Sequence, residues 1–395
     1  MIKRDAEQTI RAIAKGYPVV AITGPRQSGK TTLARSVFSQ KTYITLEAPD
    51  TLEIAENDPR GFLAGFPDGA IIDEIQRCPE LFSYLQSIVD LDGRTGLYVL
   101  TGSQQFGLLS RISQSLAGRV GLVQLLPFSY RELIRDEMNK GASSFVNISL
   151  DELLYKGLYP PIYDRNISPE IWFSNYVLTY IERDVRQILN VKDLSVFQLF
   201  VRMCAARNGQ MLNLSSLAND CGITHNTAQA WISVLEASYI IHLLRPHYRN
   251  FGKRLVKTPK LYFYDTGLAA WLLNIQDAKH LGVHPSKGSL FEGFILGEML
   301  KNRFNHGLAS NLFYWRNNLG DEIDLLEEKG ESLFPIEIKA GQTLNSDFFK
   351  GLKKWQKIAG EFSGNARLIY GGEQSSLYQG ITVSSWKDIN LPNVG

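Results

Sequence analysis

The sequence predicts an α/β protein whose first module is a parallel β-sheet and whose later modules are helical and mixed. Three observations lead to this prediction. Residues 1 to about 135 alternate strand-like and helix-like segments, a glycine-rich loop separates the first strand from the next helix, and alternating apolar and charged residues return near residues 312–339. With 395 residues the chain is too long for one ordinary core, so several domains are expected.

Composition and charge narrow the class of protein without identifying a partner. The formal net charge is only +2, so any basic surface for nucleic acid must be local. Cys78, Cys204 and Cys221 are far apart and show neither metal nor disulfide spacing, which suits a reducing compartment. We expect a cytoplasmic protein, because no signal peptide and no membrane-spanning apolar run is visible.

Five apolar, β-branched segments of the first module read as strands of a parallel sheet. A helix over residues 6–15 precedes them, with Ile10, Ile13 and Ala14 at helical spacing. The expected strands are residues 19–23, 43–47, 70–73, 97–101 and 119–126.

Residues 24–31 match the pattern G-x-x-x-x-G-K-[ST] and lie between a predicted strand and a predicted helix. Backbone N–H groups of such a loop point at a helix N-terminus, where partial positive charge favours phosphate. Lys30 would reach the outer phosphates, and the Thr31 hydroxyl would ligate Mg²⁺. The predicted nucleotide-binding residues are Gly24, Pro25, Arg26, Gln27, Ser28, Gly29, Lys30, Thr31, Thr32, Asp73 and Ser103.

Two carboxylates end the third predicted strand, Ala70-Ile-Ile-Asp73-Glu74. Ligands of parallel α/β sheets bind at the carboxyl ends of strands, so this pair belongs near the glycine loop. We expect Asp73 to hold Mg²⁺ and Glu74 to polarise the attacking water. As an alternative, the pair caps a helix.

Small hydroxyl residues and two arginines follow in the same module. Thr101 or Ser103, after the strand over 97–101, would sense the γ-phosphate, or else form an ordinary Gly-Ser turn. Arg111 and Arg119 lie at or just before the next strand, where an arginine can reach a neighbouring subunit's phosphates. The alternative for each arginine is a plain surface position.

Together, Gly24–Thr31, Asp73-Glu74, the Leu-Thr-Gly-Ser turn and the Ser-Leu-Ala-Gly-Arg stretch resemble a family of AAA-type ATPases of bacteria and archaea. Those proteins carry a conserved C-terminal region of unknown function. The resemblance implies a core with strand order 5-1-4-3-2, ATP and Mg²⁺ as ligands, and a homo-oligomer if an arginine finger acts between subunits. Lys30, Thr31, Asp73 and Glu74 match the family pattern directly, whereas the finger maps onto Arg119 or Arg111.

The segment 151–190 is predicted to be largely helical, because apolar residues recur at three- and four-residue steps. The stretch 180–185 resembles the same family. Glu182 and Arg186 would form an exposed ion pair, and a sensor role for Arg183 or Arg186 is the alternative.

Residues 193–250 read as three helices followed by an extended run, in the order of a helix-turn-helix with a wing. The third helix, over 224–237, would offer polar residues to base edges: Thr224, His225, Asn226, Thr227 and Gln229. A later basic group would contact phosphates or remain a solvated loop: Arg245, His247, Arg249, Lys253, Arg254, Lys257 and Lys260. A protein-contact or spacer role is the alternative for this module.

A second carboxylate constellation lies near the C-terminus. Asp324 and the Glu337-Ile-Lys339 run fall on two half-buried strands after a helix over 290–301, and this is the spacing of metal-dependent nucleases with restriction-enzyme-like folds. Asp324 and Glu337 would hold Mg²⁺, Glu298 or Glu292 would add a ligand, and Lys339 would orient the water. A cross-strand ion pair between Glu337 and Lys339 is the alternative.

We therefore expect an AAA-type core over 1–135, a helical lid over 136–192, a winged-helix-like domain over 193–250 and a nuclease-like domain over 251–395. The predicted function is ATP binding and hydrolysis coupled to a module that contacts or cleaves DNA. Two alternatives remain: an ATP-switched protein-binding module with an inactive nuclease-like domain, and a DNA-dependent nuclease gated by ATP. No membrane partner is expected.

Overall fold

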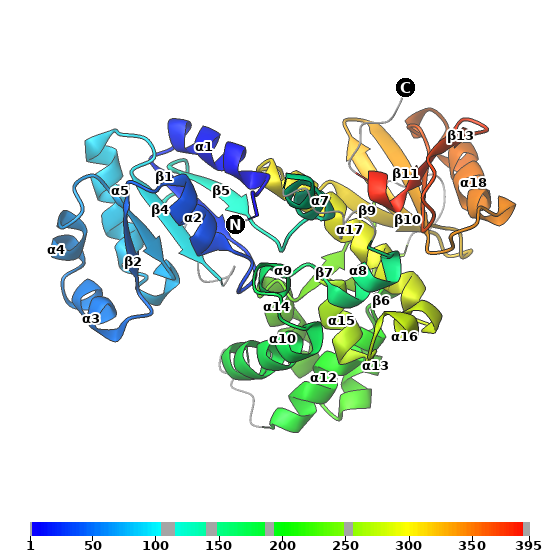
Figure 1. Ribbon diagram of the computed structural model, residues 1–395, viewed down its shortest axis with the longest axis horizontal. Coiled ribbons are helices and arrows are strands. Elements are labelled where there is room, and N and C mark those ends of the chain that lie inside the picture. Colours follow the sequence, from blue (N-terminus) through cyan, green and yellow to red (C-terminus); the bar gives the residue numbers. More distant parts are fainter. Residues whose placement is uncertain (1, 104–114, 140–147, 186–192, 249–255, 390–395) are drawn as a thin grey trace.

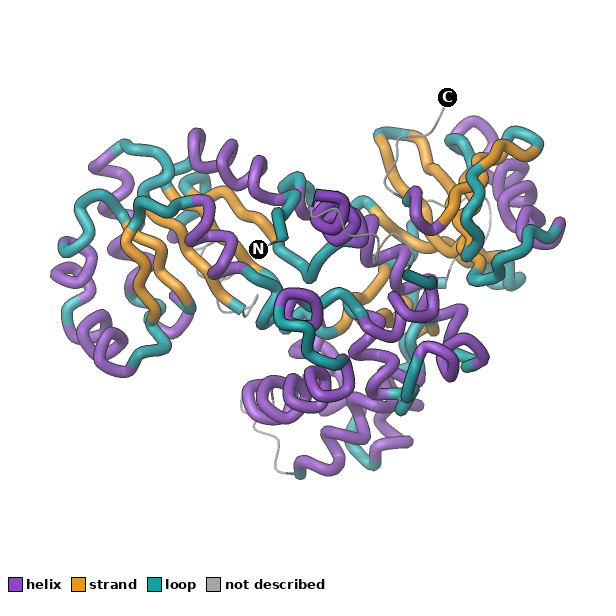
Figure 2. Tube along the Cα trace, viewed as in Figure 1, coloured by secondary structure: helices purple, strands orange, loops and turns teal. Residues whose placement is uncertain are grey.

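The computed structural model describes residues 2–103, 115–139, 148–185, 193–248 and 256–389, with the backbone alone over 182–185. Figure 1 shows a sheet-containing part at the N-terminus, a helical part in the middle and a second sheet-containing part at the C-terminus. Figure 2 shows that strands are concentrated in the first and last parts, with helices around them.

The N-terminal sheet has five parallel strands in the order β2-β3-β4-β1-β5. This confirms the expected order 5-1-4-3-2. Both faces are covered, which is why the β1 strand is buried along its whole length. The strands are β1 (Val19–Thr23), β2 (Thr42–Thr45), β3 (Ala70–Asp73), β4 (Tyr98–Gly102) and β5 (Val120–Gln124).

Helices pack on both faces of this sheet. On one face, α1 (Ala6–Gly16) and α2 (Lys30–Val37) cover Val20, Ile22 and their neighbours. On the other face lie α3 (Pro49–Asn57), α4 (Pro59–Ala64) and α5 (Leu81–Asp92). The helix α2 begins at Lys30, directly after the glycine-rich loop, so the loop lies at a helix N-terminus as expected.

The middle part consists of short helices. One helix ends before Gly157, and new helices begin at Pro160 and Pro169, because proline is favoured in the first turn of a helix. Ser168 caps one of these new starts. The segments are α7 (Tyr130–Asn139), α8 (Leu150–Lys156), α9 (Pro160–Asp164), α10 (Pro169–Tyr176) and the π-helix η2 (Val177–Val185).

Three helices and a small sheet follow in the order α12-β6-α13-α14-β7-β8, with strand order β6-β8-β7. Their bounds are α12 (Leu194–Ala206), β6 (Gln210–Met211), α13 (Leu214–Cys221), α14 (His225–Ala237), β7 (Ile241–Leu244) and β8 (Lys260–Phe263). Asn213 and Thr224 cap α13 and α14 with their side chains.

The C-terminal sheet is mixed and has the order β13-β14-β12-β11-β10-β9. One face packs on α18, and the other packs into a large core that reaches back to Ile2. The strands are β9 (Leu312–Arg316), β10 (Glu322–Lys329), β11 (Ser332–Lys339), β12 (Arg367–Tyr370), β13 (Ser376–Tyr378) and β14 (Ile381–Ser385). The helices are α15 (Thr266–Leu272), α16 (Ala278–Val283), α17 (Lys287–Asn305) and α18 (Lys350–Ala359).

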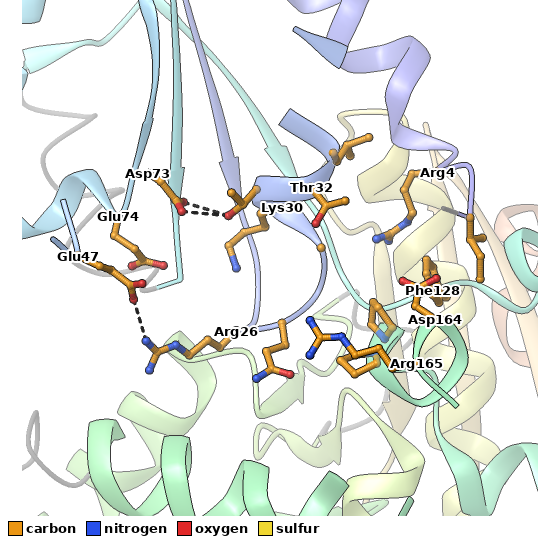
Figure 3. Close-up of a pocket in the computed structure, with 17 residues that line it drawn as sticks. Arg4, Arg26, Lys30, Thr32, Glu47, Asp73, Glu74, Phe128, Asp164 and Arg165 are labelled. Atoms are coloured by element: carbon orange, nitrogen blue, oxygen red, sulfur yellow. Dashed lines mark hydrogen bonds and ion pairs between the residues drawn. The ribbon is translucent and has the colours of Figure 1, made fainter. Parts of the chain in front are cut away.

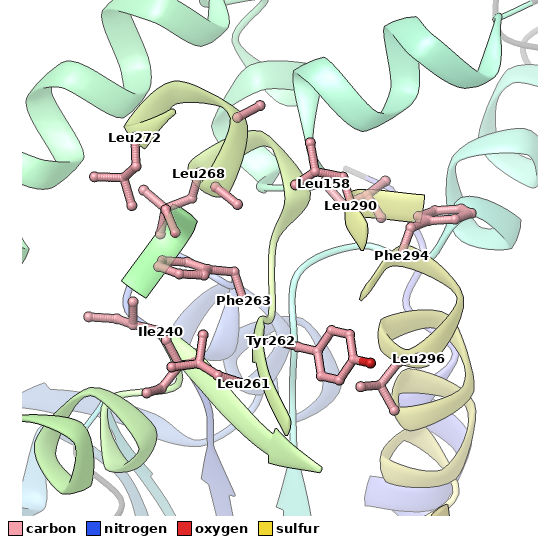
Figure 4. Packing of buried hydrophobic residues seen from close by; sticks show 14 of the residues in the cluster. Leu158, Ile240, Leu261, Tyr262, Phe263, Leu268, Leu272, Leu290, Phe294 and Leu296 are labelled. Atoms are coloured by element: carbon pink, nitrogen blue, oxygen red, sulfur yellow. The ribbon is translucent and has the colours of Figure 1, made fainter. Parts of the chain in front are cut away.

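The helix α17 joins the three parts, because it contacts α1 and β5 on one side and β11 and α15 on another. Figure 4 shows Leu290, Phe294 and Leu296 of this helix beside Tyr262 of β8 and Leu158. Among the described residues, no helix is long and apolar enough to cross a membrane.

Candidate functional site

The glycine-rich loop is held in a conformation that only glycine permits at its first position. Gly24 has φ +148°, and a Cβ there would lie 2.1 Å from the backbone oxygen of Leu125. Gly29 has φ +92° at the end of the loop, where the chain turns into α2. The loop therefore approaches the strand edge closely, and its open side faces a cavity (Figure 3).

Lys30 lies at this loop in the predicted position. Its Nζ donates a hydrogen bond of 2.7 Å to the backbone oxygen of Pro25, within the same loop. Burial lowers the pKa of Lys30 to about 8, although Glu74 and Asp73 act in the opposite direction. A buried ammonium beside a loop of backbone N–H groups is an electrostatic environment that favours an anion.

Asp73 ends β3 beside the loop and is held by three hydroxyl groups. The Thr31 hydroxyl donates to both carboxylate oxygens at 3.1 and 3.2 Å, and Tyr43 donates to Oδ2 at 2.9 Å. Thr101 on β4 donates to Oδ1. Tyr43 was not predicted, although the parallel pairing of β2 with β3 places it opposite Ile71, near the same edge.

Glu74 follows with φ +55°, a left-handed conformation that is uncommon for a residue with a side chain. Its Oε2 accepts a hydrogen bond of 3.1 Å from Ser103 and another from Gln76. Backbone strain of this kind persists only where the surroundings impose it, and it concentrates at functional sites.

The cavity at the loop has a volume of about 360 Å³, within the range of small-molecule sites. Most of the predicted nucleotide-binding residues line it, and Ser103 contacts Glu74 beside it. Several lining residues were not predicted: Glu47 beside Glu74, and, across the loop, Ile2, Arg4, Phe128, Pro160, Pro161, Asp164 and Arg165. These come from distant segments, and no local motif marks them.

Arg4 is the most constrained of the missed residues. Its guanidinium donates to the backbone oxygens of Ser28 at 2.7 Å and Leu126 at 2.6 Å, and its Nε donates to Glu132 at 3.1 Å. It also lies over the Phe128 ring at 5.0 Å. Arg4 thus connects the phosphate loop to the segment that leaves the first sheet.

Of the two predicted arginine fingers, Arg119 is described and does not line the cavity at the chain's own loop. Arg119 precedes β5 at the opposite edge of the sheet and forms an ion pair with Asp90 of α5. Arg111 and Arg186 lie outside the described residues, as does the side chain of Arg183.

The C-terminal constellation assembles in part as predicted. Lys339 Nζ lies 2.7 Å from Glu337 Oε1 and 3.3 Å from Asp324 Oδ2, across the antiparallel β10–β11 pair. Glu292 of α17 belongs to the same network through its charge. The prediction for Glu298 is wrong, because six residues of helix turn it away: it accepts from the Tyr130 backbone N–H at 3.0 Å and pairs with Lys301 at 2.8 Å.

The predicted phosphate-contacting cluster is also dispersed. Lys260 is buried, with its Nζ 3.1 Å from Glu292 and 2.5 Å from Glu322, so it is neither a phosphate contact nor a solvated loop residue. Arg245 pairs with Glu236, and His247 donates its backbone N–H to Tyr314 of β9. Arg249, Lys253 and Arg254 lie outside the described residues, whereas Thr224, His225, Asn226 and Gln229 are exposed.

The two expected magnesium sites differ in their fit. At the loop, Thr31 and Asp73 present adjacent oxygens to the cavity that Lys30 also lines, which suits a phosphate with its magnesium. No group of three or more histidine, cysteine or acidic side chains in the described part of the chain is arranged to hold a metal alone. In this arrangement Asp324 and Glu337 do not fit a metal ion, since both carboxylates form ion pairs with Lys339.

Three family models match the chain. Residues 16–134 match an AAA domain, and residues 147–279 and 287–389 match two domains of unknown function, DUF8612 and DUF4143. An uncharacterised protein of Mycobacterium tuberculosis is 33% identical over 86% of this chain and 74% of its own length. An uncharacterised protein of Methanocaldococcus jannaschii is 23% identical over 82% of this chain and 75% of its own.

Among solved structures, a Walker-type ATPase of Pyrococcus abyssi is similar over 69% of this chain and 96% of its own. The sequence identity is 15% and the TM-score 0.42.

Proposed function

Since the chain belongs to a family of bacterial and archaeal proteins that join an AAA domain to a C-terminal domain of unknown function, we propose that it binds and hydrolyses ATP at residues 24–31. One observation carries the proposal. Lys30 and Thr31 follow the loop after β1, Asp73 and Glu74 lie at the end of β3, and all four line one cavity at the carboxyl edge of the sheet.

The chain's own residues divide the work of this reaction. Loop N–H groups and Lys30 would bind the phosphates, and Thr31 and Asp73 would hold Mg²⁺, which supplies charge neutralisation. Glu74 would orient and polarise the attacking water. Arg4, Arg26 and Arg165 line the same cavity and would add positive charge, and Ile2 and Phe128 give it an apolar side for the base.

Kinetics and binding of two variants test this function. Glu74→Gln should keep ATP affinity but lower turnover by about a hundredfold or more, because it removes the group that polarises the water. Lys30→Ala should lose binding in calorimetry. The exposed control variants Glu53→Gln and Lys15→Ala should behave as the unmodified protein. Absence of ATP or ADP binding by the folded protein would contradict the proposal.

Activity should also depend on protein concentration if Arg119 completes the site of a neighbouring subunit. Arg119→Ala would then lower turnover without changing ATP affinity in a single chain. Turnover per subunit that stays constant on dilution below the assembly threshold would argue against this role.

A second candidate function is contact with duplex DNA through residues 194–263. The element order α12-β6-α13-α14-β7-β8 with strand order β6-β8-β7 favours a winged-helix fold. The exposed start of α14 would enter the major groove. The connection after β7 would not act as a free wing, because its backbone pairs with β9 at Pro246 and Tyr314.

Fluorescence anisotropy with a labelled duplex across a salt series tests this contact. Asn226→Ala and Gln229→Ala should weaken binding, whereas Asn302→Ala on α17 should not. The salt dependence should be shallow, since few cations flank α14. Equal affinity of all three variants would favour the protein-contact alternative.

We also propose a restriction-enzyme-like fold for the C-terminal domain. The order α17-β9-β10-β11-α18-β12 places Asp324, Glu337 and Lys339 on adjacent strands, in support of that fold. Because Asp324 and Glu337 form ion pairs with Lys339, we propose that this domain does not cleave nucleic acid in the arrangement described. Divalent-metal-dependent cleavage that disappears in Lys339→Ala would contradict that statement.

A further inference from the structure

A partly buried network of opposite charges joins the middle part of the chain to the C-terminal sheet. Its carboxylates come from α17 and the C-terminal strands: Glu292, Glu322, Asp324 and Glu337. Its cations are Lys339, Arg316 and Lys260, and only Lys260 comes from the small sheet of the middle part, on β8. The network therefore crosses a boundary between two parts of the fold.

Lys260 lies between Glu292 and Glu322 and forms an ion pair with each. Its Nζ lies 3.1 Å from Glu292 Oε1 and 2.5 Å from Glu322 Oε1, and 4% of the residue is exposed. Tyr262, two residues along the same strand, also donates to Glu292 Oε1. Strand β8 thus delivers both an ammonium and a hydroxyl to one carboxylate of α17.

The charged groups of the network shift one another's pKa values. Burial raises the pKa of Glu292 and Glu337 to about 7, and the charge of Asp324 adds to the shift in each. Burial alone would lower the pKa of Lys260, but Glu292, Glu322 and Asp324 outweigh it, and the pKa lies above its usual value. The lysine is therefore a full charge within the network.

A second observation indicates that the network has capacity for another cation. Glu337 is 9% exposed, and its Oε2 has no hydrogen-bond partner among the described residues. With all groups ionised, four carboxylates face three cations. Loss of Lys260 would leave two uncompensated negative charges, the amount that one divalent ion neutralises.

We propose that Lys260 is the resident cation of this carboxylate cluster, and that the cluster accepts a divalent metal ion only when Lys260 has left it. The proposal builds on the fold proposed above for the C-terminal domain, but it requires neither ATP hydrolysis nor DNA cleavage. With Lys260 in the cluster, its two ion pairs link β8 to α17 and β10.

Manganese binding to the full chain tests the proposal, measured by electron paramagnetic resonance at pH 8 without nucleotide. In the unmodified protein this pH lies above the pKa of about 7 of Glu292 and Glu337, so both carboxylates are mostly ionised there. Lys260→Met should gain one site that binds Mn²⁺ about tenfold or more tightly than anything in the unmodified protein, because one buried positive charge is gone. Adding Glu292→Gln to Lys260→Met should remove that site.

Two further variants keep the result interpretable. Lys260→Arg retains the charge and should stay without the new site. Lys287→Met breaks a more exposed ion pair, between α17 and Asp151 of α8, and should match the unmodified protein. Circular dichroism confirms that each variant is folded, and a folded Lys260→Met that binds no extra Mn²⁺ overturns the proposal. A Glu337-dependent Mn²⁺ site already present in the unmodified protein also overturns it, and ATP turnover reports separately on the proposed ATPase.

Discussion

In the proposed nucleotide cavity, single hydroxyl and ammonium groups fix the carboxylate of Asp73 and the charge beside the loop. Asp73 receives hydrogen bonds from Thr31, Thr101 and Tyr43, so its carboxylate is fixed before any ligand arrives. Tyr43 comes from the neighbouring strand β2 and remains protonated, because burial, followed by its hydrogen bond to Asp73, raises its pKa to about 12. Groups that orient a metal-binding carboxylate in this way affect metal affinity without touching the metal.

Tyr43→Phe should therefore raise the Mg²⁺ concentration needed for half-maximal ATP turnover by about tenfold, a typical cost for losing such a supporting hydrogen bond. Maximal turnover at saturating Mg²⁺ should fall much less. The measurement is a magnesium titration of steady-state hydrolysis at fixed ATP. Tyr84→Phe, at an exposed position on α5, is the control. An unchanged magnesium midpoint in Tyr43→Phe would show that Thr31 and Thr101 suffice.

Lys30 gives the site a pH dependence of defined sign. Burial lowers its pKa to about 8 in the chain without nucleotide, so a growing fraction is neutral above that pH. Binding of a polyphosphate requires the charged form, so the dissociation constant for ADP should be flat below pH 8 and rise above it, approaching tenfold per pH unit. Calorimetry over a pH series measures this. In Lys30→Arg the rise should vanish, since guanidinium stays charged.

At the scale of elements, the molecule depends on buried charges where segments meet. Arg4, just before α1, and Glu132 of α7 form an ion pair of 3.1 Å with side chains 5% and 0% exposed. Glu132 also accepts the backbone N–H groups of Asp5 and Ser129. One carboxylate thus organises the start of two helices, and its only described cation is Arg4.

Removing one member of this pair should be far more damaging than removing both. Arg4→Met leaves Glu132 charged and buried, and we expect a loss of about 3 to 5 kcal/mol in the free energy of unfolding. Arg4→Met combined with Glu132→Met should recover part of that loss. The exposed pair of Arg11 and Glu7 is the matched control, where Arg11→Met should cost about 0.5 kcal/mol or less.

Urea denaturation followed by circular dichroism gives these free energies. A cost for Arg4→Met close to that for Arg11→Met would mean that water reaches Glu132 in solution.

At the scale of the whole molecule, the sequence predicted what local patterns determine. The loop, the strand that ends in Asp73-Glu74 and the hairpin of Asp324 with Glu337 each follow from residue spacing within one or two elements. Residue spacing does not determine which face of a helix packs against which neighbouring element. Glu292 and Glu298 lie on one helix, yet only packing against β8 and α7 decides that Glu292 joins the carboxylates and Glu298 holds Tyr130.

The wall of the cavity opposite the loop was unpredictable for the same reason. Arg4 and Arg165 stand in segments without any motif, and only the tertiary fold brings them to the glycine loop. Lys260 lies within a basic run of the sequence, but its burial depends on acidic residues that follow more than thirty positions later, Glu292 and Glu322.

The buried charges also form a continuous physical route from the nucleotide cavity to the C-terminal part. Arg4 contacts the loop at Ser28 and the carboxylate of Glu132, Glu132 holds the backbone at Ser129, and the next residue, Tyr130, donates to Glu298 of α17. Each step is a direct contact between the described residues. A displacement of the loop on phosphate binding would therefore shift the contacts that hold α17.

Hydrogen exchange with and without ADP tests this coupling. We expect ADP to slow amide exchange at the loop, over residues 126–133 and in the part of α17 around Glu298, because the nucleotide fixes the loop oxygen that Arg4 binds. Glu298→Gln should keep the ADP affinity but lose the protection of α17, since a neutral amide holds Tyr130 and Lys301 less strongly. Lys287→Met, on the same helix but off the route, should keep it. If ADP protects the loop while α17 exchanges at an unchanged rate in the unmodified protein, the two parts respond independently, and the buried charges serve stability alone.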